Sequence, residues 1–299
     1  MLTQQILNGL VSGSVYALFA LGFTLIFGVQ KLLNLAHGAT FMAGAFVAYY
    51  ATISGLPFWL AVILAVVACG VLGILIDLVA FRPLRAKGDV EFAEFPAIVS
   101  SLGVSLILIS IAQQMSNTRV LNFPFGTFPV EFYRVAGLRI SLLQIVILVT
   151  VLVLVSLLIL YLQKTSFGRQ VRAVATNERA AALLGVNAQS VFMQTFLIAG
   201  ALAGLAGVLI GLLFNSIHFM MGEPYMLRAF VIVVIGGLGS VPGALVASLL
   251  LGLMQSLTVA YLPSGLVDTI IFGLLFLVLL VRPNGLFGRV TALSGGNRR

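Results

Sequence analysis

Charge is what this sequence most lacks, since only 8% of its 299 residues are charged while 61% are hydrophobic. Soluble globular domains typically carry about 25% charged residues. The mean hydropathy of +1.18 agrees, so the composition excludes a soluble domain and predicts an integral membrane protein. Lysine and arginine outnumber the acidic residues by 16 to 8. They lie at the ends of apolar runs rather than on one polar face, so we expect contacts with membrane lipid and no binding of nucleic acid.

Cysteine, histidine and clustered carboxylates are also scarce. The single cysteine, Cys69, excludes an intramolecular disulfide. The two histidines have no partner at the spacing of metal ligands, and the eight acidic residues are scattered. The phosphate-binding pattern GxxxxGK[ST] is absent from the sequence, so we expect the chain not to hydrolyse nucleotides itself. We therefore expect a chain that is not an enzyme, with no catalytic residues, no metal site and no cofactor of its own.

Long apolar runs fill most of the chain, and most of them are long enough to cross a hydrocarbon core of about 30 Å. They fall at about 6–29, 35–53, 57–81, 95–115, 141–163, 190–214, 226–236, 240–262 and 264–281. The first run lacks the charged leader and cleavage site of a signal peptide, so we expect it to be retained. The sequence predicts an all-α polytopic protein of about eight or nine transmembrane helices, with residues 1–299 forming one membrane domain.

One run, 226–236, is too short for a full crossing and is followed by the breaker GGLGSVPG. A broken helix is tolerated in a membrane only where protein or a water-filled cavity shields its backbone. We therefore predict a discontinuous or re-entrant segment near 226–243. For the same reason its glycines, Gly236, Gly237 and Gly239, are candidates for the translocation path.

The basic residues predict the orientation of the chain. Twelve of the sixteen lie on one side if the N-terminus is outside. These are Lys31, Arg82, Arg85, Lys87, Lys164, Arg169, Arg172, Arg179, Arg282, Arg289, Arg298 and Arg299. Arg119, Arg134, Arg139 and Arg228 remain on the other side. Because cytoplasmic segments carry the excess of lysine and arginine, the richer side is predicted to be cytoplasmic.

The most polar internal segment is 164–189, which we call the cytoplasmic loop. Thr176 or Asn177 can cap a helix there, Glu178 lies in its first turn, and Gly185 suits a left-handed end. These signals predict about two turns of helix that either lie in a cleft of another protein or rest on lipid headgroups. The candidate residues for such docking are Thr176, Asn177, Glu178, Arg179, Ala180, Ala181, Ala182, Leu183, Leu184 and Gly185.

A second polar feature lies inside an apolar run, in NLAHGATFMAG at 34–44. Asn34, His37 and Thr40 are spaced by three residues and so share one face of a helix. This face either lines the translocation path or packs in the bundle, with His37 bonded to a neighbouring carbonyl. An ion-coupled carrier would instead need carboxylates inside its helices. Only Asp77 and Asp268 lie in or at the end of an apolar run, and Asp77, five residues before Arg82, is expected to make an interfacial charge contact.

Five segments in order resemble the permease subunits of bacterial ABC importers for branched-chain amino acids, specifically the LivH-type member. They are LNGLVSGSVYALFALGFTLIFGV (7–29), NLAHGATFMAG (34–44), GRQVRAVATNERAAALLGVN (168–187), RAFVIVVIGGLGSVPGALV (228–246) and VRPNGLFG (281–288). The resemblance covers nearly the whole chain.

The resemblance implies an inner-membrane permease that forms half of a translocation path. Its implied partners are a second related permease, two cytoplasmic ATPases that bind the ATP, and a periplasmic or lipid-anchored binding protein. Residues 176–187 match the helix that couples such permeases to an ATPase. The sequence departs from the common EAA-x3-G pattern, because Arg179 follows Glu178 and the glycine comes at 185.

The resemblance makes leucine, isoleucine and valine the default substrates. Related permeases carry urea, amides, other amino acids or small organic acids, and these stay open as alternatives. A stand-alone channel or secondary carrier is the alternative from a different functional class.

Overall fold

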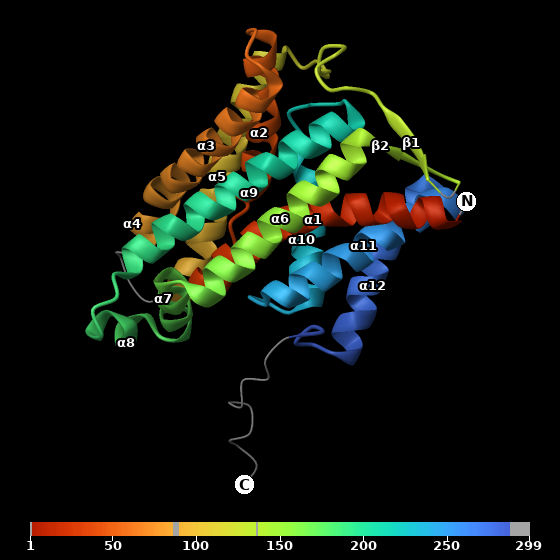
Figure 1. Cartoon of the computed structure of the whole chain (residues 1–299). Helices are drawn as coiled ribbons and strands as arrows, with labels where there is room; N and C mark the ends of the chain where they lie inside the picture. The colour runs from red at the N-terminus through yellow and green to blue at the C-terminus, as the bar shows by residue number, and fades with distance from the viewer. Residues whose placement is uncertain (1, 86–89, 136, 288–299) are drawn as a thin grey trace.

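The computed structural model describes residues 2–85, 90–135 and 137–287 as a bundle of helices with one small hairpin (Figure 1). The helices of the first half are α1 (Leu2–Gln30), α2 (Ala36–Ile53), α3 (Phe58–Ile76), a π-helical turn (Asp77–Phe81), α4 (Arg82–Arg85), α5 (Val90–Ser116) and α6 (Leu142–Lys164). Those of the second half are α7 (Ser166–Thr176), α8 (Glu178–Leu183), α9 (Ala188–Phe214), α10 (Gly222–Gly236), α11 (Val241–Tyr261), a 3-10 turn (Ser264–Leu266) and α12 (Val267–Val281).

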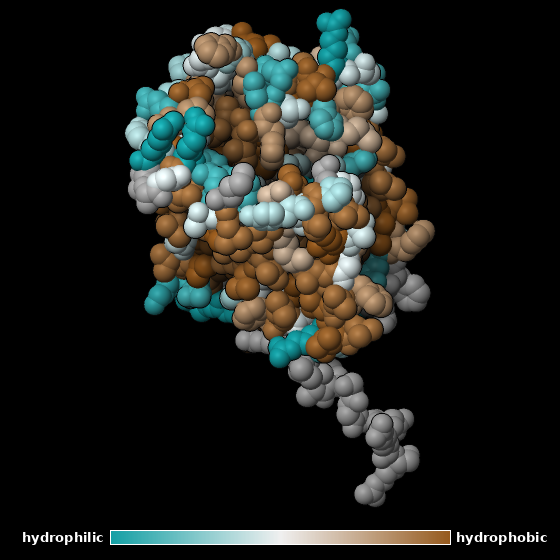
Figure 2. Space-filling model, turned by 90° about the vertical axis from the view of Figure 1, so that its right-hand side faces the viewer, coloured by the Kyte–Doolittle hydropathy of each residue, from teal (hydrophilic) through white to brown (hydrophobic). Residues whose placement is uncertain are grey.

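Six of these helices are long and apolar enough to cross a membrane. They occupy Leu2–Gln30, Phe58–Arg85, Glu94–Ser116, Leu142–Lys164, Ala188–Phe214 and Val241–Tyr261, and α12 is a shorter apolar helix. Figure 2 shows hydrophobic side chains over much of one face of the molecule. The prediction of an all-α polytopic membrane protein is confirmed, and the number of crossings stays a prediction.

Helices α1 and α9 form the centre of the bundle. Of the most apolar 18 residues in each, 83% and 72% are buried, against 22% in α5 and α6. Small residues allow this close packing. A Cβ atom on Gly44 of α2 would lie 2.2 Å from the Gly204 carbonyl oxygen of α9, and one on Gly9 of α1 would lie 2.8 Å from Leu253 Cα of α11. Glycine is therefore required where these helices cross.

Two helices begin inside the bundle rather than at its surface. The side chain of His37, in the first turn of α2, lies against Gly22 of α1. Gly22 is eight residues before Gln30, the last residue of α1, and so lies about 12 Å from that end of α1. The start of α10 at Gly222 packs directly on Gly38 of α2. The loop 117–141 between α5 and α6 is called the external loop here, because its arginines were predicted to lie on the side opposite the cytoplasm. The segment preceding α10 is bonded to this loop through the Leu121–Ile217 bridge, and the turn after α10 brings Gly239 against Gly28. Residues 226–243 thus comprise most of α10, a turn and the start of α11, and the discontinuous or re-entrant crossing stays a prediction.

The external loop contains a hairpin that the sequence analysis did not predict. Strands β1 (Phe132–Val135) and β2 (Leu138–Ser141) pair antiparallel, with Phe132 opposite Ser141. Gly137, with φ at +81°, lies in the turn between them. The Arg139 N–H donates to Gln4 Oε1 at 3.0 Å, which fixes the hairpin to the start of α1.

Candidate functional site

The cytoplasmic loop contains the predicted short helix, α8. Asn177 caps it, because its Oδ1 accepts from the Ala180 N–H at 3.0 Å. At the other end Gly185 has φ at +84°, and the Val186 N–H donates to the Ala181 carbonyl at 3.0 Å. Of the two predicted caps, Asn177 is thus the one used. Thr176 ends α7 instead, and its hydroxyl donates to the Arg172 carbonyl at 2.8 Å.

Helix α7 was not predicted as a separate element, although its pattern is amphipathic. Phe167, Val171 and Val174 recur at helical spacing and are buried. They pack with Val191 and Phe192 at the start of α9. This small apolar cluster holds the cytoplasmic loop against the membrane helices, so α8 projects from a fixed base.

The tip of α8 exposes two large apolar side chains. Leu183 is 90% exposed and Leu184 is 84% exposed, whereas Ala181 on the opposite face is buried. Two adjacent leucines so fully exposed at a polar end of the molecule are typical of a surface that another protein covers. The exposed tip thus fits the predicted coupling segment, and its coupling role remains a prediction.

A buried carboxylate ties this end of the bundle together. Asp77, in the π-helical turn, is fully buried, and its Oδ1 lies 2.7 Å from Arg85 Nη2. Its Oδ2 accepts from Gln189 Nε2 at 3.2 Å, and its Oδ1 accepts from Gln30 Nε2 at 3.5 Å. The expected charge contact therefore exists but involves Arg85 rather than Arg82. Arg82 is exposed, whereas the Arg85 guanidinium lies along α9, 4.4 Å from the centre of the Phe192 ring.

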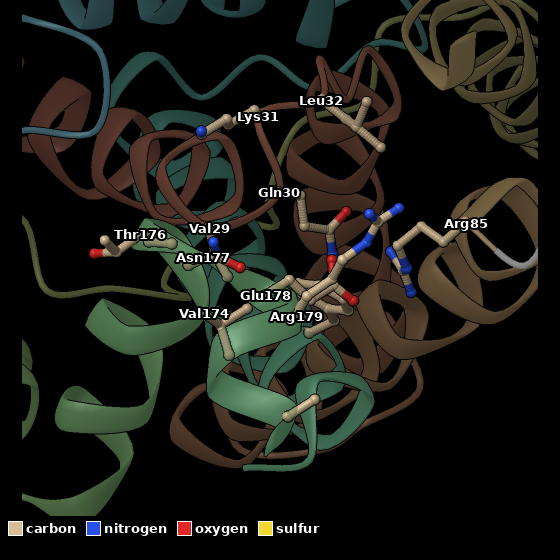
Figure 3. A pocket seen from close by; sticks show the side chains of 13 residues that line it. Val29, Gln30, Lys31, Leu32, Arg85, Val174, Thr176, Asn177, Glu178 and Arg179 are labelled. Atoms are coloured by element: carbon tan, nitrogen blue, oxygen red, sulfur yellow. The ribbon is translucent and has the colours of Figure 1, made fainter. Parts of the chain in front are cut away.

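A cavity of about 460 Å³ separates α8 from the end of α1 (Figure 3). Five of the predicted coupling residues line it: Thr176, Asn177, Glu178, Arg179 and Ala182. Gln30 and Arg85 line the same cavity, and Figure 3 shows their side chains directed toward that of Arg179. The sequence analysis missed Gln30 as a member of this site because nothing local connects it with residues more than 140 positions later.

The three polar residues at 34–40 do not share one helical face as predicted, because α2 begins only at Ala36 and Asn34 lies in the turn before it. All three are packed inside the bundle. Asn34, His37 and Thr40 are each 1–2% exposed. His37 Nε2 lies 3.1 Å from the Phe19 carbonyl oxygen, and its ring stacks on that of Phe19 at 4.6 Å. Asn34 Oδ1 accepts from the Ala36 N–H, and the Thr40 hydroxyl donates to the Ala36 carbonyl, both at 3.1 Å. Each side chain has a structural partner, and their role in the translocation path stays a prediction.

The predicted path glycines form the tight turn at the end of α10. Gly237 and Gly239 have φ at +99° and +80°, and a Cβ on Gly236 would lie 2.5 Å from the Gly243 carbonyl carbon. The Leu286 N–H donates to the Ile235 carbonyl at 2.7 Å, which holds the segment after α12 against this turn. These glycines are brought together with one another but not with Asn34, His37 and Thr40. Their place in the path also stays a prediction.

Comparison with known proteins decides the family. Residues 5–280 match the family model described as branched-chain amino acid transport system / permease component. The chain belongs to this permease family. It is 33% identical to the high-affinity branched-chain amino acid permease LivH of Escherichia coli K12, over 96% of this chain and 95% of that one. It is 34% identical, with the same coverage, to BraD of Pseudomonas aeruginosa. It is 26% identical to the ribose import permease RbsC of Haemophilus influenzae, over 85% and 76% of the two chains.

The permease is therefore a transport subunit and a multi-pass protein of the bacterial inner membrane. Its basic segments gather at one end, as the orientation argument requires: Lys31, Arg85 and Arg179, from three distant parts of the sequence, line the cavity behind α8. Arg228, which was assigned to the external side, lies in α10, where its Nη1 donates to the Tyr16 hydroxyl at 3.0 Å, and its side of the membrane stays a prediction. Lys87, Arg289, Arg298 and Arg299 lie outside the described residues.

Proposed function

We propose that this permease forms one half of the translocation path of an ATP-driven importer for branched-chain amino acids: leucine, isoleucine and valine. The similarity to LivH and BraD along almost their entire length supports this substrate class. A second related permease completes the path, a periplasmic or lipid-anchored binding protein delivers the substrate, and two cytoplasmic ATPases bind and hydrolyse the ATP. The permease itself supplies no nucleotide site.

The exposed tip of α8 is the observation that carries the coupling proposal. A helix of six residues is marginal by itself in water, so its two caps and its base on α7 preorganise it for a partner. Leu183 and Leu184 would enter an apolar groove of an ATPase. Gln189, the second residue of α9, bonds to Asp77, and the turn 184–187 joins this residue to α8. Movement of an ATPase would then reach α1 and α9 through this buried carboxylate.

A relative that is 26% identical to this chain is named as a ribose import permease, so identity at this level does not by itself fix the transported solute. Urea, amides and other small amino or organic acids therefore remain the alternative substrates. Competition of unlabelled solutes against labelled leucine in the uptake assay described next separates them. Stronger competition by urea or an amide than by isoleucine and valine would reassign the substrate.

The coupling test uses proteoliposomes that contain this permease with its partner permease and ATPases, ATP inside and liganded binding protein outside. Replacing Leu183 and Leu184 together by serine is expected to lower leucine uptake by at least about tenfold, because the groove contact is lost. Unfolding temperature should not change, since both side chains are already in water. Phe125→Ser, at a fully exposed position of the external loop, is the matched control. Unchanged uptake in the double variant, or leucine flux through the permease without ATPases, overturns the proposal.

A further inference from the structure

A second cavity, of about 280 Å³, lies where α2, α5 and α10 meet. Its apolar wall includes Met42, Leu102 and Met226, and its polar groups come from Gly38, Ser105 and Glu223. The volume is at the lower end of the range of about 300–1,000 Å³ found for small-molecule sites. The cavity is therefore the right size for a compact solute with one apolar part and few polar groups.

The N-termini of α2 and α10 meet at this cavity. A Cβ on Gly222 would lie 2.1 Å from the Gly38 carbonyl oxygen, so the two first turns are in direct contact. The first amides of a helix have no acceptor within the helix. Asn34 accepts from Ala36 and His37, but in the part of the chain that the structure describes the amides of Gly38 and Gly222 have no acceptor. Both helix dipoles also favour a negative charge at this position.

Ser105 supplies an independent sign that something binds here. It is only 9% exposed and lines the cavity, yet among the described residues its hydroxyl makes no hydrogen bond. Ser101, one turn earlier on α5, contrasts with it, because its hydroxyl oxygen accepts from the Leu35 N–H at 3.1 Å. The Ser105 oxygen is not fully enclosed by protein, so its remaining accessible surface is at the cavity. The fold uses Ser101 and leaves Ser105 available to a ligand.

Glu223 adds a negative charge beside these amides. It is the second residue of α10, lines the cavity and is exposed, and no ion pair within the described ranges involves it. Arg228, five residues later, bonds to Tyr16 at 3.0 Å and lies 3.7 Å from Asp268, and it does not line the cavity. The cavity thus offers amide donors for an anion and, next to them, a carboxylate for a cation.

We infer that this cavity binds the backbone of an aliphatic α-amino acid as a zwitterion. The substrate carboxylate accepts from the free amides of Gly38 and Gly222 and from Ser105, and its ammonium group donates to Glu223. The aliphatic side chain packs on Met42, Leu102 and Met226. A purely anionic solute would face Glu223 without compensation, and a purely cationic one would face the helix N-termini. The assignment rests on the proposed function and adds the groups that recognise the substrate inside the membrane.

Protection from a thiol reagent tests binding directly. Leu227→Cys places a thiol at the cavity, at a position 56% exposed, in a chain whose single cysteine, Cys69, is buried. In the reconstituted complex, a small methanethiosulfonate should label this thiol, and leucine should slow the labelling several-fold. 4-Methylpentanoate, which lacks the ammonium group, and 3-methylbutylamine, which lacks the carboxylate, should not. Phe125→Cys in the external loop should be labelled at the same rate with and without leucine.

Substitution of the ligating groups gives a second readout. Glu223→Gln should lower leucine uptake by about ten- to a hundredfold, as expected for a lost charged hydrogen bond. ATPase stimulation by liganded binding protein should stay within about twofold, because α8 is intact. Ser105→Ala should lower uptake less, and Glu131→Gln, whose carboxylate accepts from Tyr133 in the external loop, should leave it unchanged.

The outcomes separate the two proposals. If the unsubstituted complex imports none of the three amino acids, the proposed function is wrong. If it imports leucine but labelling of the thiol at 227 is absent or unaffected by leucine, or Glu223→Gln transports normally, only the zwitterion site is wrong.

Discussion

Two regions of this permease carry side chains whose polarity is opposite to that of their surroundings. At the start of α2 and in the turn before it, polar side chains lie in an apolar bundle, where Asn34, His37 and Thr40 are almost completely buried. On α8, apolar side chains lie in a polar segment, where Leu183 and Leu184 are almost completely exposed.

The difference between them lies in whether the unusual group already has a partner. His37 bonds to Phe19, and Asn34 and Thr40 bond to Ala36 in the first turn of α2, so their polarity is satisfied by the fold. The α8 leucines touch little and gain nothing from the fold by being exposed. A buried polar group that already has a hydrogen-bond partner is thus weaker evidence for function than a large apolar side chain that is exposed to water. Ser105 and Glu223 belong with α8 in this respect, because neither side chain has a hydrogen-bond or ion-pair partner among the residues that the structure describes.

The largest effect on stability is expected at Asp77, the most connected of the buried polar groups. Asp77→Ala should lower the free energy of unfolding by about 3–5 kcal/mol, because Arg85 then loses its buried carboxylate. Thermal unfolding of the purified permease in detergent measures this. Arg82→Ala, at a nearby exposed position, is the control and should change stability by less than about 0.5 kcal/mol. Equal effects of the two variants would show that the buried pair is not what holds this end together.

The next largest effect is expected at the cap of α8. Asn177→Ala removes the acceptor of the Ala180 N–H and should cost the helix about 1 kcal/mol. Uptake should fall several-fold while global unfolding is unchanged, because only a short exposed helix frays. Hydrogen exchange at Ala180 should become faster. Asn177→Asp, which keeps an acceptor, should restore both; if it does not, the cap is not the reason for the loss.

A smaller effect is expected at His37. His37→Phe keeps the stacking on Phe19 and loses the hydrogen bond to its carbonyl, at a cost of about 0.5–1.5 kcal/mol. Uptake per folded permease should be unchanged if this residue only packs. Uptake lost at unchanged stability would reverse that view and would support the predicted position of His37 in the translocation path.

The smallest effect is expected at Thr40. Its hydroxyl donates to the Ala36 carbonyl one turn earlier, and that bond adds little to a helix. Thr40→Val should change neither unfolding temperature nor the relative uptake of leucine, isoleucine and valine. Altered selectivity among the three would place Thr40 at the substrate and would weaken the contrast between α2 and α8.

Local signals explain what could be predicted from the sequence. The membrane class follows from the low charge, and the orientation follows from the bias of basic residues. The ends of α8 follow from Asn177 and Gly185, because caps involve atoms only three to five residues apart. The hairpin at 132–141 and helix α7 also depend on local sequence patterns. They were not predicted because neither contains a long apolar run.

The candidate sites were predicted only in part, since their other members are distant in the sequence. Gln189 and Asp77 are 112 positions apart, and Leu35 and Ser101 are 66 apart. No periodicity signals that Gly38 and Gly222 will meet, or that Ser101 will be used while Ser105 is not.

The sequence by itself thus determined that this chain is a membrane protein with a capped helix in its most polar internal segment, and its resemblance to known permeases indicated the family. Composition is read directly from the sequence, and the hydrogen bonds of a helix cap join residues that are close in the sequence. Only the tertiary structure decided which polar groups are satisfied, because a partner for a buried donor or carboxylate comes from another helix. That is why the sequence left two roles open for His37, lining the path or packing against a neighbouring carbonyl, and the structure shows its bond to the Phe19 carbonyl. Ser105 and Glu223 emerged only when α2, α5 and α10 were brought together.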